Sequence, residues 1–126
     1  MLNKLKAAFA KEGEAIAAAR KAVKIFKAKW AIEKEWEKAR FKLQKKINRI
    51  LAPEAEPSLD TLWGLLPEYN MRQQGCETAR AARFEALAVC ESAWGAASEA
   101  ESARMRVELA MCRMPCCRAF VEQLAV

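Results

Sequence analysis

The residues of this chain best suited to chemistry are its five cysteines, and the chain contains no histidine to assist them. A cysteine becomes a nucleophile when a base or a positive charge lowers its pKa. Arg113 and Arg118 flank the cluster formed by Cys112, Cys116 and Cys117, but there is no imidazole base. The four glycines are scattered and form no phosphate-binding loop. We therefore expect no enzymatic activity, no catalytic residue and no cofactor.

The thiols allow three structural interpretations. If Cys76 and Cys90 lie on one helix, they are roughly 21 Å apart, well beyond the ~7 Å Cα separation that a disulfide tolerates. Any disulfide must then join different elements, such as Cys76 or Cys90 with the cluster Cys112, Cys116 and Cys117. A four-cysteine zinc site would need paired short spacings on both sides, which are missing. Free buried thiols are the third interpretation, and the odd count leaves at least one thiol unpaired.

A row of five cations forms the second candidate site. They follow one another at spacings of four, four, three and four residues, namely Lys34, Lys38, Lys42, Lys45 and Arg49. Such spacing places them on one ridge of a helix, where like charges repel each other. One interpretation is a surface for an anionic partner: an RNA backbone, acidic lipid headgroups or an acidic protein face. The other is a solvated outer face, with counter-charge supplied by Glu33, Glu35 and Glu37.

The net charge of +6 conceals a division between the two halves of the chain. Residues 1–50 contain 15 Lys and Arg against 5 Glu, whereas residues 51–126 contain 7 Arg against 11 acidic residues. The halves are therefore suited to different surroundings. No apolar run approaches the ~18 residues that span a bilayer, so we expect no transmembrane segment.

The element that must carry the cationic ridge is a helix over residues 1–51. Apolar residues recur at helical spacing to Trp30, with Glu12 as a gap, and the stripe then steps round the helix and resumes at Trp36. Pro53 marks the end. About 49 residues at roughly 1.5 Å each make a rod of roughly 74 Å, twice the diameter of a compact domain of this size. Such a rod requires a partner surface.

The rest of the chain divides at its prolines. Residues 52–75 read as an acidic linker with a short apolar helix at 58–66, which Pro67 closes and a loop follows. We expect this apolar patch to be buried, either in the elbow of a hairpin or in another subunit. Residues 76–126 form an alanine-rich, cysteine-bearing segment with a second long helix and a short one at 116–124. The fold class is all-α and extended, with the two long helices pairing as an αα-hairpin.

Large apolar side chains are sparse and strung along the helices, so a self-sufficient core is not expected. The bulkiest ones are suited to packing against a partner helix, namely Trp30, Trp36, Leu62, Trp63 and Trp94. Aromatic residues at helical spacing are typical of packing rather than of base stacking.

Two short stretches resemble the PDSW-type accessory subunits of mitochondrial complex I. At the C-terminal end they are Cys112-Arg113, Cys117-Arg118 and Val121-Glu122-Gln123, and in the first helix Lys29-Trp30 with Ile32-Glu33-Lys34. Together they cover about a fifth of the chain. That family separates its cysteine pair by about three helical turns, whereas Cys112 and Cys117 are five residues apart, so no disulfide is carried over. The resemblance implies a mitochondrial location, peripheral to the inner membrane, in a respiratory-chain complex.

Three functional hypotheses follow. The first is a non-catalytic accessory subunit that braces a larger assembly of other protein subunits, with anionic lipid headgroups as a further partner. The second is a nucleic-acid-binding or ribosome-associated protein that uses the basic ridge over residues 34–49. The third is a self-assembling coiled coil.

Overall fold

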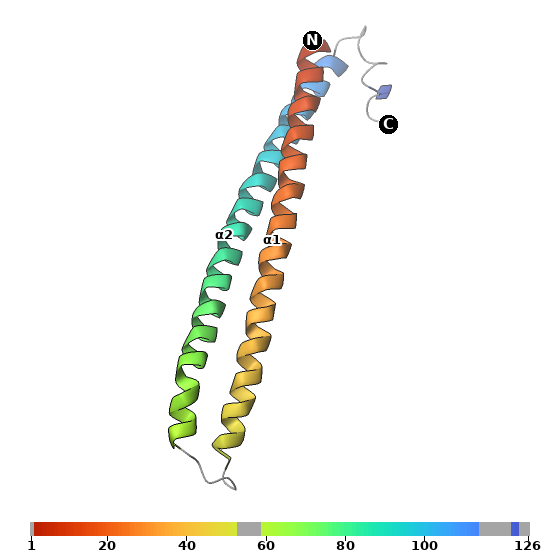
Figure 1. Cartoon of the computed structure of the whole chain (residues 1–126). Helices are drawn as coiled ribbons and strands as arrows, with labels where there is room; N and C mark the ends of the chain where they lie inside the picture. Colours follow the sequence, from red (N-terminus) through yellow and green to blue (C-terminus); the bar gives the residue numbers. More distant parts are fainter. Residues whose placement is uncertain (1, 53–58, 114–121, 124–126) are drawn as a thin grey trace. The chain divides into compact units, whose positions relative to one another are not determined.

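The computed structural model describes residues 2–52, 59–113 and 122–123. Nearly all of them belong to two helices, α1 (Leu2–Ile50) and α2 (Leu59–Cys112), and these ranges contain no strand (Figure 1). The predicted all-α class is confirmed. The short helix expected at 116–124 falls largely outside the described residues, as do Cys116 and Cys117.

Helix α1 has the extent that its sequence predicts. It continues without a break through Gly13 and ends at Ile50. The Leu51 amide donates to the Ile47 carbonyl at 3.0 Å, which closes the last turn just before Pro53. Arg49 lies in that last turn, where a cation interacts favourably with the negative end of the helix dipole.

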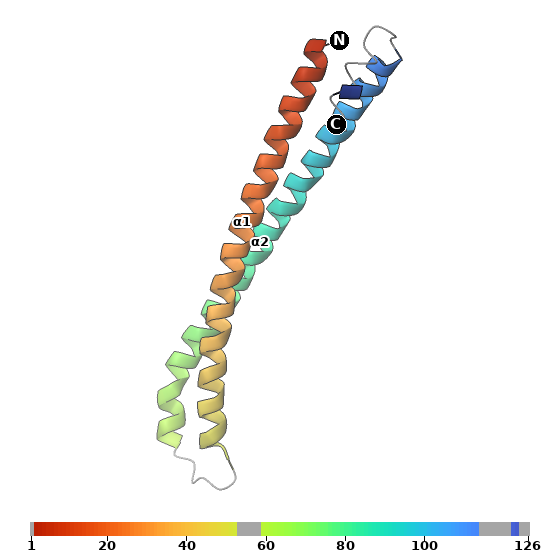
Figure 2. The same ribbon diagram turned by 90° about the vertical axis from the view of Figure 1, so that its right-hand side faces the viewer.

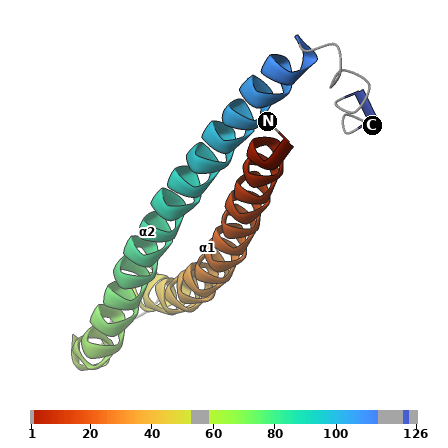
Figure 3. The same cartoon turned by 90° about the horizontal axis from the view of Figure 1, so that it is seen from above.

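Helix α2 corrects the prediction for residues 58–75. The residues predicted to form a short helix, a stop at Pro67 and a loop instead belong to one continuous helix, which begins at Leu59 (Figure 3). Pro67 removes one backbone hydrogen bond, but it lies on an exposed face. On the opposite face Leu62, Tyr69 and Cys76 are half-buried or buried at seven-residue intervals on both sides of the proline. Packing against α1 therefore outweighs the local preference for a break.

The chain folds into two compact units, and each unit takes one segment from each helix. The first consists of residues 1–23 with 88–126, and the second of residues 24–87. These bounds differ from the predicted divisions at 1–51, 52–75 and 76–126, because helices pair across the chain rather than with their neighbours in sequence. In the second unit the orange-to-yellow part of α1 and the green part of α2 lie side by side (Figures 1 and 2).

Within each unit the two segments run antiparallel. In the first unit Leu5 packs on Met111, both fully buried, with Phe9 and Val107 beside them. In the same unit the later residue Glu12 contacts the earlier residue Arg104. This antiparallel pairing of two long helices is the predicted helical hairpin.

The inward faces follow a seven-residue repeat. Buried or half-buried positions recur on α1 at Leu5, Glu12, Ala19, Phe26, Glu33, Arg40 and Ile47. On α2 they recur at Leu62, Tyr69, Cys76, Arg83, Cys90, Ala97, Arg104 and Met111. Spacing of this kind is typical of coiled-coil packing. Of the ten hydrophobic residues that are buried in the described ranges, seven are alanine or cysteine, so the helix pairs enclose little apolar volume.

Charged residues occupy several inward positions of the second unit. Glu33 is only 4% exposed and forms an ion pair with Arg83, while Arg80 lies 3.6 Å from its carboxylate. Arg40 donates to Gln73 at 3.4 Å in the same interface. The predicted step of the apolar stripe between Trp30 and Trp36 is therefore wrong. The repeat continues without a step, but it passes through polar side chains.

The apolar gap at Glu12 has the same explanation in the first unit. Glu12 pairs with Arg104, which also donates to Glu108 at 2.8 Å. Burial disfavours the charged form of Arg104, but hydrogen bonds to Glu108 and Glu12 and their charges more than offset it and raise the pKa of Arg104. The guanidinium therefore stays charged at every pH at which the chain would be handled.

Candidate interaction surfaces

The predicted basic ridge is an exposed face of the second unit. All five of its residues are exposed, namely Lys34, Lys38, Lys42, Lys45 and Arg49. At about 100° per residue they lie roughly opposite the inward row of α1, so α2 covers none of them. Lys24 and Lys27 are also exposed and continue the ridge toward the start of the unit.

Two aromatic rings lie along one side of this ridge. The Nζ of Lys34 is 4.5 Å from the ring centroid of Trp30, and that of Lys45 is 4.8 Å from the centroid of Phe41. Trp30 is 45% exposed and Phe41 is 61% exposed. Both are cation–π contacts at the surface, worth about 0.5–1 kcal/mol each. Trp30 thus belongs to the outer face, although Phe26 packs beside it at 5.7 Å between centroids.

The counter-charge expected for the ridge is partly committed elsewhere and partly too exposed to contribute much. Glu33 points into the helix interface and pairs with Arg83. Glu35 lies 3.4 Å from Lys38, but both side chains are well exposed, and such pairs contribute little in water. The ridge therefore keeps most of its positive charge.

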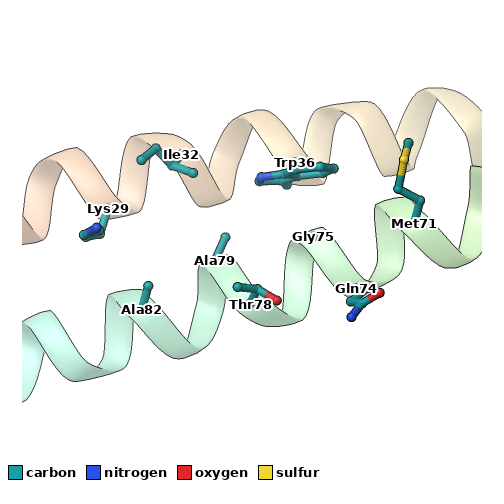
Figure 4. A pocket seen from close by; sticks show the side chains of 9 residues that line it. All are labelled: Lys29, Ile32, Trp36, Met71, Gln74, Gly75, Thr78, Ala79 and Ala82. Atoms are coloured by element: carbon teal, nitrogen blue, oxygen red, sulfur yellow. The ribbon is translucent and has the colours of Figure 1, made fainter.

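An apolar groove of about 400 Å³ lies between the helices of the second unit (Figure 4). Trp36 from α1 and Gly75 from α2 face each other in it, with Ile32 and Met71 also along the groove (Figure 4). A Cβ built on Gly75 would lie 2.6 Å from Cδ2 of Trp36 and closer still to two other ring carbons. Trp36, predicted as a partner-packing residue, therefore packs half-buried against its own chain.

The apolar residues near the start of α2 form a second exposed surface, which we call the apolar end. Leu62 and Leu66 line a groove of about 270 Å³ with Ile47. Leu59 and Trp63 lie outside that groove and are exposed, Trp63 by 68%. The expectation that this patch is buried in the elbow of a hairpin is therefore wrong, and burial in another subunit stays a prediction.

The first unit also exposes large apolar side chains. Trp94, predicted to pack on a partner helix, is about half exposed. Val89, Met105 and Leu109 are similarly exposed on α2, as is Leu2 on α1. The exposed positions of α2 lie outside the buried row of that helix, so pairing with α1 does not cover them.

The three described cysteines all lie on α2 with free thiols. Cys76 and Cys90 are buried and Cys112 is half-buried. A disulfide from Cys76 or Cys90 to Cys112 is excluded, because residues 14 or more apart on one helix are separated by roughly 20 Å or more. Within residues 2–52, 59–113 and 122–123 no group of cysteine and acidic residues could hold a metal ion.

The burial of Cys76 predicts protection from chemical modification. A variant that keeps only Cys76 should react with a thiol reagent at least about tenfold more slowly than one that keeps only Cys112, because the thiol is reached only when the helices open. The rates are measured spectrophotometrically in a stabilising osmolyte, and in urea the two should become equal. Equal rates in the folded, helical chain would contradict the described burial.

The sequence did not reveal that charged residues hold the helices together. Arg72, Arg83 and Arg104 are partly buried and face α1, yet arginine is ordinarily a surface residue. The seven-residue register of Arg83 and Arg104 with Cys76 and Cys90 was the available signal. The apolar pattern does not show this register, because arginine is not an apolar residue.

No family model, curated protein or solved structure matches the chain. In the described part of the chain no helix is long and apolar enough to cross a membrane. A role for the protein must therefore be argued from its own surfaces.

Proposed function

We propose that the protein is a non-catalytic accessory subunit that braces a larger protein assembly. One observation carries the proposal: the large apolar side chains lie mostly outside and the small ones inside. Fifteen large hydrophobic residues are exposed in the described chain, whereas the buried set of ten contains only three larger than cysteine, Leu5, Leu43 and Met111.

The energetics favour further burial of this surface. Burying one large apolar side chain contributes about 1.5–3 kcal/mol, and contiguous apolar patches of soluble proteins usually mark interaction sites. Leu59, Trp63 and Leu66 at the apolar end lie within two turns of one another, with Leu51 on α1 also exposed. A partner protein that covers them would supply the stabilisation that the small interior lacks.

Self-assembly and a mitochondrial assembly have less support. A coiled coil formed by self-assembly would need a free heptad face, but the heptad faces of α1 and α2 already pair within the chain. A mitochondrial respiratory complex as the assembly, peripheral to the inner membrane, is supported by the resemblance to PDSW-type subunits alone.

The apolar end provides the test. In an extract of cells that make the protein, the intact chain should elute in a discrete large assembly on native size-exclusion chromatography in mild detergent. The variant Leu59→Gln, Trp63→Gln, Leu66→Gln should elute mostly outside it, because a polar patch offers the partner little apolar area. The variant Asn70→Ala, at an exposed polar position of the same helix, should stay in the assembly.

The behaviour of the purified chain provides an independent check. Alone it should be partly unfolded or aggregated, since its apolar surface has no cover. A monomer that melts cooperatively from dilute solution would count against the proposal, and so would assembly that the triple variant leaves intact.

A further inference from the structure

We propose that the outer face of α1 in the second unit binds single-stranded nucleic acid. Lysine and arginine would contact phosphates, while Trp30 and Phe41 would stack on bases. This inference concerns a different surface from the apolar end and goes beyond the proposed function, on which it does not depend.

The charge of the face is the first support. Residues 24–50 of α1 contain ten Lys and Arg against three Glu, and one of those three, Glu33, is turned inward. The cations of the outer face are all exposed, and in the described part of the chain the ion pair of Lys38 with Glu35 is itself exposed to water. Releasing the counterions of phosphates is the main driving force when such a face meets a nucleic acid.

The arrangement of the cations is the second support. From Lys34 to Arg49 the ridge extends about 22 Å along the helix, with a cation every 5–6 Å on average. A single row of this kind can follow one linear polyanion. The row therefore fits one phosphate strand, and the aromatic rings beside it decide between a single strand and a duplex.

The two aromatic rings are the third support, and they favour unpaired bases. Trp30 and Phe41 lie about 16 Å apart along the helix, on the same side of the cationic row. Each ring already holds a lysine ammonium over one face. A base that stacks on that face takes the place of the ammonium, which is then free to contact the neighbouring phosphate. Surfaces that bind single strands without sequence preference combine these two features. Bases stacked inside a duplex would not be available to the rings.

An anionic membrane fits the same face less well. A helix that lies in a membrane interface buries an apolar face opposite its charges. In α1 that opposite face is covered by α2, as the buried Leu43 and Glu33 show. The outer face offers only the two rings, set among seven cations, for contact with acyl chains. A single-stranded nucleic acid has phosphates that the cations can contact and unpaired bases that the two rings can stack on.

The test uses the full chain, in a stabilising osmolyte that keeps it folded, and a fluorescently labelled oligouridylate, with binding followed by anisotropy. Five phosphate contacts predict an affinity that falls about 100-fold between roughly 50 and 200 mM salt. The variant Lys34→Gln, Lys38→Gln, Lys42→Gln, Lys45→Gln should lose at least tenfold in affinity and most of the salt dependence.

A matched variant separates the ridge from net charge. Lys4→Gln, Lys6→Gln, Lys11→Gln, Lys21→Gln removes the same charge from four exposed lysines of the same helix in the first unit. It should lose less than about twofold in affinity. Equal losses in the two quadruple variants would overturn the proposal, because they would show attraction by overall charge.

The aromatic residues are tested separately, with circular dichroism to confirm that each variant stays helical. Trp30→Ala and Phe41→Ala should each weaken binding about fivefold or more at constant salt slope. Trp63→Ala and Trp94→Ala, which remove equally exposed rings elsewhere, should leave it unchanged. No effect of the first pair would overturn the stacking of bases.

Competition identifies the class of partner. Unlabelled oligouridylate should displace the probe, and double-stranded RNA should do so less well at equal phosphate concentration. Phosphatidylserine vesicles or polyglutamate that compete as effectively as the single strand would overturn the proposal in favour of a lipid surface or an acidic protein. No binding of the oligonucleotide at low salt would overturn it outright.

Discussion

Replacing Arg83 with alanine is expected to destabilise the second unit by about 2–4 kcal/mol. Arg83 is the nearer cation to the Glu33 carboxylate, which is almost fully buried, and its removal leaves that charge in the interface with only Arg80 at 3.6 Å. An uncompensated buried charge typically costs 3–5 kcal/mol, and the second arginine reduces this value. Urea unfolding followed by circular dichroism, in an osmolyte that keeps the starting state folded, measures the change.

Two further variants identify the cause. Arg80→Ala removes the more exposed and more distant arginine and should cost less than about 1 kcal/mol. The double variant Glu33→Leu, Arg83→Leu should be more stable than either single alanine variant, since an apolar pair carries no desolvation cost. If Arg83→Ala were no more destabilising than Arg80→Ala, the stability of the buried Glu33 carboxylate would not depend on Arg83.

The buried ion pairs also suggest why the helices adopt one register. Glu33 lies opposite Arg83, and a slip of one heptad would place it opposite Cys76 or Cys90 instead. The same slip in the first unit would set Glu12 against Ala97 or Met111 rather than Arg104. Alanine-rich faces fit one another in several registers, so we hypothesise that the charged positions specify one of them. The double leucine variant tests this. A mixture of registers, seen by cross-linking Cys76 or Cys90 to single cysteines introduced into α1, would support it.

Much of the fold could be predicted from the sequence because its signals are local. The bounds of α1 follow from its continuous helical pattern and from Pro53. The course of α2 could not be predicted in this way, since Pro67 indicates a local break and the packing that outweighs it involves residues far away in sequence. The inward face of α1 was missed between Trp30 and Trp36, because Glu33 and Arg40 occupy it and their partners lie on the other helix.

The candidate surfaces were likewise predictable only where the signal in the sequence is local. The exposure of the ridge from Lys34 to Arg49 was predictable, because like charges at helical spacing must face water or an anionic partner. The environment of each tryptophan was not predictable, because the same residue type is found both between the helices and at the surface. Trp36 lies in the groove beside Gly75, whereas Trp30 and Trp63 lie at the surface.

Gly75→Ala is expected to destabilise the second unit by about 1–2 kcal/mol, although alanine ordinarily strengthens a helix by 0.5–1 kcal/mol relative to glycine. The new methyl group would meet the ring of Trp36 at a separation that carbon atoms do not tolerate. The ring must leave its position against α2, and overpacking of this kind typically costs 1–3 kcal/mol. Urea unfolding of the variant, compared with the unaltered chain, measures the net effect.

The other glycines of α2 provide the control, because nothing lies within 4 Å of a Cβ placed on Gly64 or Gly95. Gly64→Ala and Gly95→Ala should therefore stabilise their units by about 0.5–1 kcal/mol, the opposite sign from Gly75→Ala. In a Trp36→Leu background the smaller side chain leaves room for the methyl group, and Gly75→Ala should lose its penalty. Three alanine substitutions of equal effect would show that helix propensity alone governs these sites, and that Trp36 does not pack on Gly75.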